Sequence, residues 1–112
     1  MIFGDFRRLA LSLPEAVESA HLGRPDFRVG GRIFATLWTK ERRAVVLLSP
    51  EEQAMLLAAE PAIFAAVPGG WGRRGATFIV LEAVDETTLT SALRIAWARR
   101  APKRLLAGFG RN

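Results

Sequence analysis

Basic side chains, a tryptophan and the only histidine of the chain gather in one segment, residues 21–38, HLGRPDFRVGGRIFATLW. Its arginines Arg24, Arg28 and Arg32 each present a fork of N–H donors that fits a phosphate group. His21 would act as a general base only with a partner and a pocket, and a histidine hydrogen-bonded at the end of a strand is the simpler interpretation. The segment therefore indicates a working surface for anions rather than a catalytic centre.

A second stretch with this chemistry is the loop 68–75, PGGWGRRG. It lacks the Lys-Ser/Thr pair of a Walker loop, and it leads into a predicted strand, which argues against the dinucleotide fingerprint. Arg73 and Arg74 are candidates for phosphate contacts, and Trp71 is a candidate for stacking on a base. The alternative is a loop whose tryptophan packs into the core, and both interpretations stay open.

The sequence contains no set of residues typical of a catalytic or metal site. It has no cysteine and one histidine, which excludes thiolate zinc sites, cysteine nucleophiles and sites with several histidines. Glu51, Glu52, Asp85 and Glu86 stand at predicted helix starts, where the helix dipole accounts for them. We expect no metal, no cofactor and no enzymatic activity.

The formal net charge of +5 and the pI of about 11.2 arise almost entirely from arginine, since Lys40 and Lys103 are the only lysines. A basic domain favours polyanionic partners such as nucleic acid, although a GC-rich genome would also enrich arginine. After Glu86 the chain has no acidic residue, which is unlike a solvated helix face of mixed sign. The cations that follow are Arg94, Arg99, Arg100, Lys103, Arg104 and Arg111.

Apolar spacing and turn residues predict a helix over 5–13 and strands over 17–22, 26–29, 32–39, 44–48 and 77–81. The residues Ser49-Pro50-Glu51-Glu52 predict a capping box at the start of a helix. This helix is expected to restart at Pro61 and to end near Val67. Asp85 caps a long helix that carries Trp97 on its apolar stripe. Gly30-Gly31 predicts a type I′ turn with Val29 opposite Arg32 and Phe27 opposite Phe34.

These elements predict one α+β domain over residues 1–112. It has two layers, an antiparallel sheet of about five strands and N-terminal, middle and C-terminal helices packed on one face. The sequence does not decide which face of the sheet is covered. No signal peptide is visible, and no apolar run approaches the ~20 residues of a membrane span, so we expect a soluble cytoplasmic protein without membrane contact.

The order of several short motifs resembles the MmcQ/YjbR family. The motifs run over nearly the whole chain: Leu13-Pro14-Glu15, the stretch 21–35, Leu48-Ser49-Pro50-Glu51-Glu52, Gly70-Trp71-Gly72-Arg73-Arg74-Gly75 and Ala101-Pro102-Lys103. The positions that match the family pattern are His21, Gly23, Arg24, Pro25, Arg32, Trp71, Gly72 and Lys103, with Arg32 where the pattern often has lysine. The resemblance implies a small bacterial cytoplasmic protein with a fold similar to type III secretion chaperones and loosely to frataxin. Its members are described as DNA-binding through a double-wing surface, and the resemblance implies no catalytic residues.

Three functions remain open. The first is binding of nucleic acid, with DNA favoured and little sequence preference, by Arg24, Arg28, Arg32, Lys40, Arg42, Arg43, Arg73, Arg74, Lys103 and Arg104. The second is a protein-interaction or chaperone-like module, with a homodimer as one form, that exposes an apolar patch of Phe27, Val29, Phe34 and Trp38. The third is a small-molecule binder or an unrecognised enzyme, which a pocket containing His21, Arg24 and Trp71 would support. A continuous basic face would favour nucleic acid, whereas arginines paired with acids would favour the compositional explanation.

Overall fold

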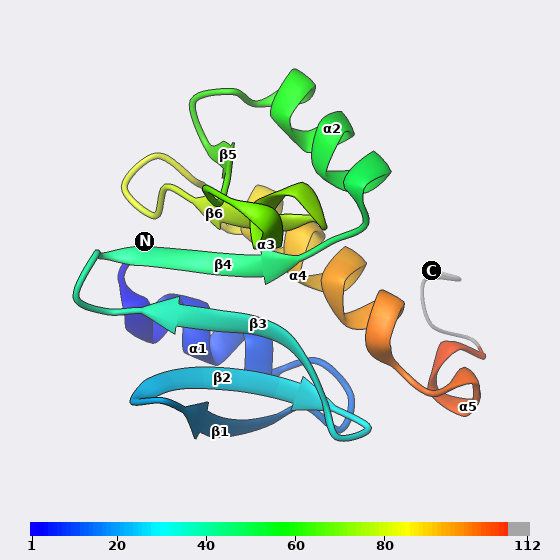
Figure 1. Ribbon diagram of the computed structural model, residues 1–112. Helices are drawn as coiled ribbons and strands as arrows, with labels where there is room; N and C mark the ends of the chain where they lie inside the picture. Colours follow the sequence, from blue (N-terminus) through cyan, green and yellow to red (C-terminus); the bar gives the residue numbers. More distant parts are fainter. Residues whose placement is uncertain (108–112) are drawn as a thin grey trace.

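A six-stranded antiparallel sheet forms the centre of residues 1–107, which the computed structural model describes (Figure 1). The strands lie in the order β1-β2-β3-β4-β6-β5. They are β1 Val17–His21, β2 Arg24–Val29, β3 Arg32–Trp38, β4 Arg43–Leu47, β5 Phe64–Ala66 and β6 Ala76–Ile79. The helices are α1 Phe3–Leu11, α2 Pro50–Ala59, α3 Gly70–Arg73, α4 Glu86–Arg100 and α5 Lys103–Leu106. The predicted α+β class is confirmed, with one strand more than expected.

Local signals fix the ends of several elements as predicted. The Ser49 hydroxyl accepts from the Glu52 N–H at 3.1 Å, and the Glu52 carboxylate accepts from the Ser49 N–H at 2.8 Å, which completes the capping box of α2. The Asp85 carboxylate caps α4 by accepting from the Thr88 N–H at 2.7 Å. Gly30 and Gly31 both have positive φ, 58° and 77°, as a type I′ turn between β2 and β3 requires.

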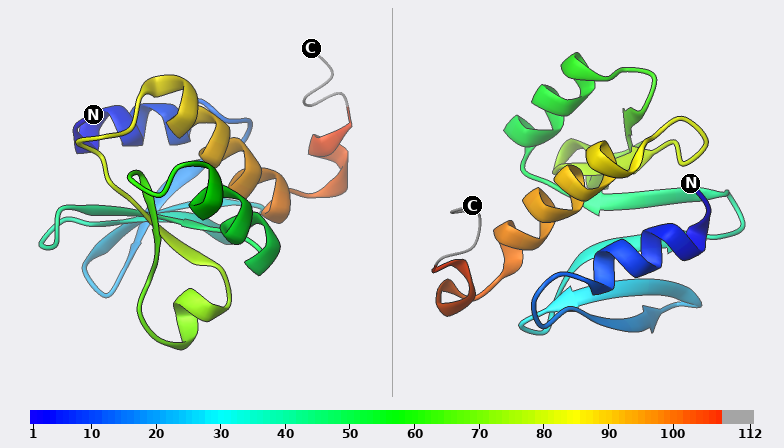
Figure 2. Two further views of the ribbon diagram at one scale, coloured as in Figure 1. Left: turned by 90° about the horizontal axis from the view of Figure 1, so that it is seen from above. Right: turned by 180° about the vertical axis from the view of Figure 1, so that it is seen from behind.

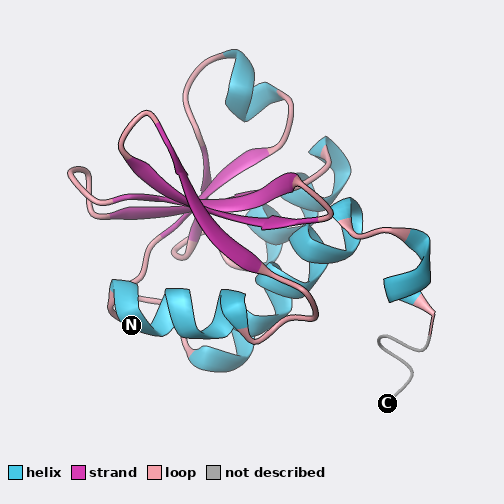
Figure 3. Ribbon diagram, turned by 90° about the horizontal axis from the view of Figure 1, so that it is seen from below, coloured by secondary structure: helices cyan, strands magenta, loops and turns pink. Residues whose placement is uncertain are grey.

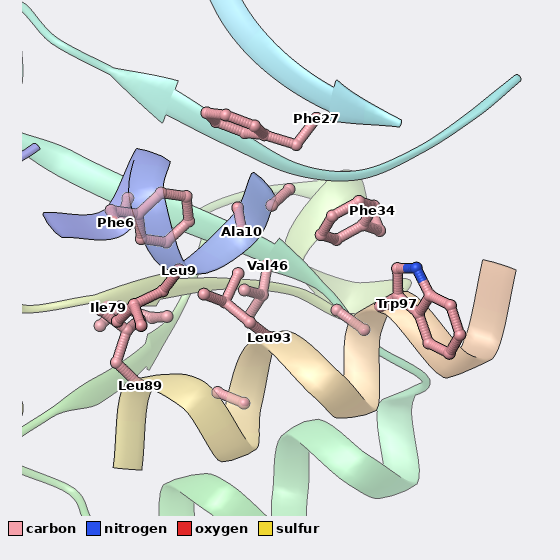
Figure 4. Packing of buried hydrophobic residues seen from close by; sticks show 14 of the residues in the cluster. Phe6, Leu9, Ala10, Phe27, Phe34, Val46, Ile79, Leu89, Leu93 and Trp97 are labelled. Atoms are coloured by element: carbon pink, nitrogen blue, oxygen red, sulfur yellow. The ribbon is translucent and has the colours of Figure 1, made fainter. Parts of the chain in front are cut away.

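Two helices, α1 and α4, cover one face of the sheet, and the main core lies between them and the strands (Figures 2 and 4). Phe6 of α1 packs edge-on against Phe27 of β2, with ring centroids 5.8 Å apart. Trp97 of α4 is fully buried and donates its indole N–H to the Pro14 carbonyl at 3.0 Å. The predicted core position of Trp97 is therefore confirmed.

A bulge between β2 and β3 decides which side chains reach the opposite face. Val29 pairs with Arg32 as predicted, but the register then shifts and Phe27 pairs with Ala35, so the predicted Phe27–Phe34 pairing is wrong. The consecutive residues Phe34 and Ala35 both join the main core. Beyond the bulge the alternation of the strand resumes and directs Trp38 away from that core.

The segment after α2 differs most from the sequence prediction. The sequence predicts that residues 61–67 restart the helix, but Phe64–Ala66 form the edge strand β5 on β6. The backbone pairing with β6 outweighs the local helix propensity of this alanine-containing stretch. The glycine-rich loop contains the short helix α3, which lies on the face opposite α1 and α4 (Figure 3). The helices are therefore not all on one face.

The apolar patch expected for a protein-interaction module is not a surface. Phe27, Val29 and Phe34 are completely buried beneath α1 and α4, and Trp38 belongs to the other face of the sheet. The prediction is wrong for these side chains because alternation along a strand does not say which face the helices cover.

Candidate functional site: an aromatic and basic sheet face

Three aromatic rings meet on the sheet face that α1 and α4 leave uncovered. Trp38 of β3 stacks on Trp71 of α3, with ring centroids 5.7 Å apart and planes 13° apart. Phe78 of β6 meets Trp38 edge-on at 5.2 Å. A second, smaller cluster of buried residues underlies these rings: Val45, Leu47, Val67 and Ala76. Trp71 itself is 36% exposed, so the loop tryptophan packs against the sheet and still presents surface to solvent.

Backbone proximity holds α3, and with it Trp71, close to the sheet. A Cβ on Gly72 would lie 1.4 Å from the Val67 carbonyl oxygen, so no larger residue fits without displacement of the backbone. From α2, the Gln53 side chain donates to the carbonyls of Gly72 at 3.0 Å and Ala76 at 2.9 Å. The sequence does not single out Gln53, because nothing in a helical stretch shows which loop its amide reaches.

Guanidinium groups lie over two of the aromatic rings. Arg24 lies 3.8 Å from the Trp38 ring centroid, and Arg43 lies 5.3 Å from that of Phe78. Such cation–π contacts orient a guanidinium while leaving its N–H edge available for an anion. Arg24 also contacts Glu41 at 3.2 Å, which offsets part of its charge.

A buried carboxylate fixes the next hairpin arginine. Asp26 is 1% exposed and accepts two hydrogen bonds from Arg28, at 2.8 and 3.0 Å. This fork-to-fork pair raises the pKa of the Arg28 guanidinium above its ordinary value, and burial opposes that change. Arg28 is therefore committed largely to Asp26.

A cavity of about 640 Å³ opens on this face and contains the three residues proposed for a small-molecule pocket, His21, Arg24 and Trp71. Asp26, Thr36, Trp38, Lys40 and Glu41 line it as well. The indole N–H of Trp38 is buried and has no hydrogen-bond partner in the described part of the chain. A buried donor without an acceptor is uncommon in folded proteins.

The other predicted cations are distributed around several elements. Lys40, Arg42 and Arg43 lie in and after the β3–β4 turn, and Arg73 and Arg74 end α3, all exposed. Arg32 stands exposed at the start of β3. Lys103 and Arg104 belong to α5, where Arg104 contacts Glu15 with two hydrogen bonds of 2.8 Å. Arg111 lies outside the described residues.

Ion pairs divide the arginines into two groups. Five of them face carboxylates within residues 1–107: Arg7–Glu18, Arg8–Glu86, Arg24–Glu41, Arg28–Asp26 and Arg104–Glu15. The cations of the β3–β4 turn and of α3 have no such pair in this part of the chain. The surface is thus neither one continuous basic face nor an even mixture of signs.

An antiparallel sheet with a helix layer on one face and an aromatic, basic cavity on the other defines a small α+β domain. The chain belongs to the YjbR family, whose family model matches residues 11–99. The fold is similar to the crystal structure of Deinococcus radiodurans protein DR2400, which carries a DUF419 domain. That similarity has a TM-score of 0.69 and 22% sequence identity, and it covers 85% of this chain and 75% of the other.

No curated protein matches the chain. Within residues 1–107, no helix is long and apolar enough to cross a lipid bilayer. The same residues contain no group of three or more histidine, cysteine, aspartate or glutamate side chains that could hold a metal ion.

Proposed function

We propose that the chain binds nucleic acid, DNA in the first instance, through the uncovered sheet face and the loops around it. The observation that supports this most is the combination of stacked tryptophans with arginines over the rings and unpaired cations in the adjacent loops. Aromatic faces stack on bases, and guanidinium groups contact the phosphates between them.

The loops supply the phosphate contacts in this proposal. Arg24 and Arg28 are partly neutralised by Glu41 and Asp26, so they orient the surface more than they add charge to it. The phosphate contacts fall to five exposed cations that have no ion pair with residues 1–107, namely Lys40, Arg42, Arg43, Arg73 and Arg74. Arg32 at the start of β3, and Lys103 and Arg104 in α5, have a supporting role.

Recognition of base edges has little support in the sequence. Gln53 is the only glutamine, and its amide already donates to Gly72, Ala76 and Thr77 inside the fold. Asn112 is the only asparagine. Side-chain amides are the usual readers of adenine, so binding is expected to depend on charge and stacking rather than on base sequence.

Fluorescence anisotropy with labelled duplex and single-stranded DNA at several salt concentrations tests this function. We expect binding tighter than about 10 μM near physiological salt, where non-specific affinities span about 10⁻⁴ to 10⁻⁶ M. Trp71→Ala should weaken single-strand binding more than duplex binding, because unpaired bases are free to stack. Absence of binding to either DNA even at low salt would refute the proposal.

The cavity favours one other function, the binding of a small planar anion. Arg24, Lys40 and Trp71 line it together, which suits an aromatic carboxylate or a nucleoside monophosphate. A rise in melting temperature with such compounds, absent in Trp71→Ala, together with no affinity for DNA, would select this function. We propose a binding role without catalysis in either case, since His21 is exposed and its side chain forms no hydrogen bond or ion pair with residues 1–107.

A further inference from the structure

A second cavity, of about 180 Å³, lies where the end of β4, the end of α3 and the last turn of α4 come together. Its basic lining residues are Arg74, Arg99 and Arg100, and its apolar ones include Leu47, Leu48 and Trp71. None of the residues that line it is acidic. Trp71 and Leu47 also line the larger cavity, so the two hollows share a wall.

Positive charges are concentrated at this cavity, and their mutual repulsion opposes folding. Arg100 is partly buried, and its Nε–H is shielded from solvent without a hydrogen-bond partner among residues 1–107. Burial lowers the pKa of the Arg100 guanidinium below its ordinary value, and the neighbouring charges of Arg99 and Arg32 lower it further. No ion pair in this part of the chain includes any of the four arginines at positions 32, 74, 99 and 100.

The helix dipole explains only part of this arrangement. Cations at the C-terminus of a helix are favoured, which accounts for Arg99 and Arg100 in the last turn of α4. It does not account for Arg74, which comes from α3, or for a buried guanidinium N–H that no carbonyl accepts. A bound anion would account for the presence of Arg74, because it would neutralise the repulsion among the three guanidinium groups that line the cavity.

We propose that Arg74, Arg99 and Arg100 form a binding site for a single phosphate group, beside the aromatic face and separate from it. Guanidinium forks suit the several acceptor oxygens of a phosphate, and three of them from two elements surround it better than one. At about 30 Å³ for each water, the volume holds roughly six waters, which suits one phosphate with a little solvent and not a whole nucleotide.

Two sources of this phosphate share the same chemistry. One is the terminal phosphate of a nucleic acid whose last base stacks on Trp71, and this source rests on the proposed function. The other is a free phosphate or a small phosphomonoester. Because Trp71 forms a wall of both cavities, a ligand at either one is expected to change its fluorescence.

Titration with inorganic phosphate, against chloride at matched ionic strength, tests the site itself. The melting temperature and the tryptophan fluorescence of the unaltered chain should change with phosphate in a saturable way, since a ligand that binds only the folded state stabilises it. Arg100→Gln should weaken phosphate binding by about tenfold or more, because it removes a charged donor. In phosphate-free buffer this variant should melt no lower than the unaltered chain, since it relieves the repulsion from Arg99 and Arg32.

Arg8→Gln is the control, because it removes one positive charge from α1, on the other face of the sheet, and this side chain does not line the cavity. It should keep its phosphate affinity. Equal responses to phosphate and chloride, or an Arg100→Gln variant that binds phosphate as well as the unaltered chain, would overturn the inference. A variant that does not fold is recognised by far-UV circular dichroism, and Arg74→Gln then gives the same test from the other element.

Oligonucleotides with a 5′-phosphate or a 5′-hydroxyl end distinguish the two sources. A preference for the phosphorylated end that Arg100→Gln abolishes assigns the site to nucleic-acid ends. Saturable phosphate binding by a chain that binds neither oligonucleotide assigns it to free phosphate, which supports this inference while the proposed function fails.

Discussion

At the scale of single residues, the candidate site depends on two positions that carry no charge, Gly72 and Gln53. Both act on the backbone of α3, the helix that presents Trp71. Arg73 and Arg74 contribute charge, and their placement follows from this backbone contact. Substitutions at Gly72 and Gln53 should therefore change the site without removing any group that contacts a ligand.

Gly72→Ala should lower the free energy of unfolding by about 1–3 kcal/mol, as overpacking of a close contact does. The new Cβ would lie 1.4 Å from the Val67 carbonyl oxygen, so α3 must move away from the sheet. Urea denaturation measures the change. Gly4→Ala in α1 meets only a side-chain carbon at 3.8 Å and should be neutral or stabilising by up to about 1 kcal/mol, and equal effects at both positions would contradict the argument.

Gln53→Met should lower the free energy of unfolding by about 1–3 kcal/mol, because it leaves the Gly72 and Ala76 carbonyls without their side-chain donor. The tryptophan emission should also change, since α3 carries Trp71 against Trp38. Met55→Gln, on the exposed side of the same helix, serves as the control and should leave both readouts unchanged. A stable variant with unaltered emission would show that the amide does not hold α3.

The residue types of the site were predictable, but their neighbours were not. Trp71, His21 and Arg24 stand out by residue type. A small-molecule site requires that these three residues line one pocket, and in the structure they do line one cavity. The Arg24–Trp38 contact depends on the bulge in the β2–β3 pair, which the alternation of apolar residues does not reveal. In the sequence, Arg100 is a cation in the last turn of a helix, a position that the helix dipole alone explains. Only the tertiary fold brings Arg74 beside it.

At the scale of elements, helix starts are the best-determined features of this chain. The Ser49 and Asp85 caps were predictable because each involves residues only three positions apart. The strand β5 was not predictable, because residues 64–66 become a strand only through pairing with β6, eleven or more positions away. Local signals therefore determine α2 and α4, and nonlocal pairing decides the segment between α2 and α3.

The cap of α4 should make the stability of the helix depend on acid pH. The hydrogen bond from Thr88 lowers the pKa of the Asp85 carboxyl below its ordinary value of 3.8. A lowered pKa in the folded state stabilises the fold above pH 3.8, and this contribution disappears as the pH falls through the folded-state value. Urea denaturation above and below pH 3.8 should thus show a smaller acid destabilisation for Asp85→Asn than for the unaltered chain. Identical pH profiles would show that the cap does not titrate with folding.

At the scale of the whole molecule, the two faces of the sheet differ in what they carry. The face toward α1 and α4 holds the main core, and the face toward α3 holds the aromatic and basic cavity (Figure 2). Charge follows the same division in part, since the α1 arginines are paired with carboxylates and those of α3 are not. Salt should therefore weaken ligand binding on one face more than it weakens the fold.

The double variant Arg73→Ala plus Arg74→Ala should reduce the salt dependence of duplex binding. Each phosphate that a cation neutralises adds about 0.9 to the slope of log K against log salt, so removal of two such cations should decrease the slope by about 2. Arg7→Ala plus Arg8→Ala removes the same charge from α1, on the covered side of the sheet, and should leave the slope nearly unchanged. Anisotropy titrations across salt measure both, and equal slopes for the two variants would assign binding to net charge alone.

The order of strands in the sheet also has a consequence for synthesis on the ribosome. The strands β1 to β4 are consecutive, so this part of the sheet can pair through short-range contacts as soon as residue 47 has emerged. The helix α4, which covers Phe34 and Val46 with its apolar stripe, is translated some forty residues later. During that interval the nascent chain exposes an apolar sheet face protected by α1 alone, and this is the stage at which aggregation competes with folding.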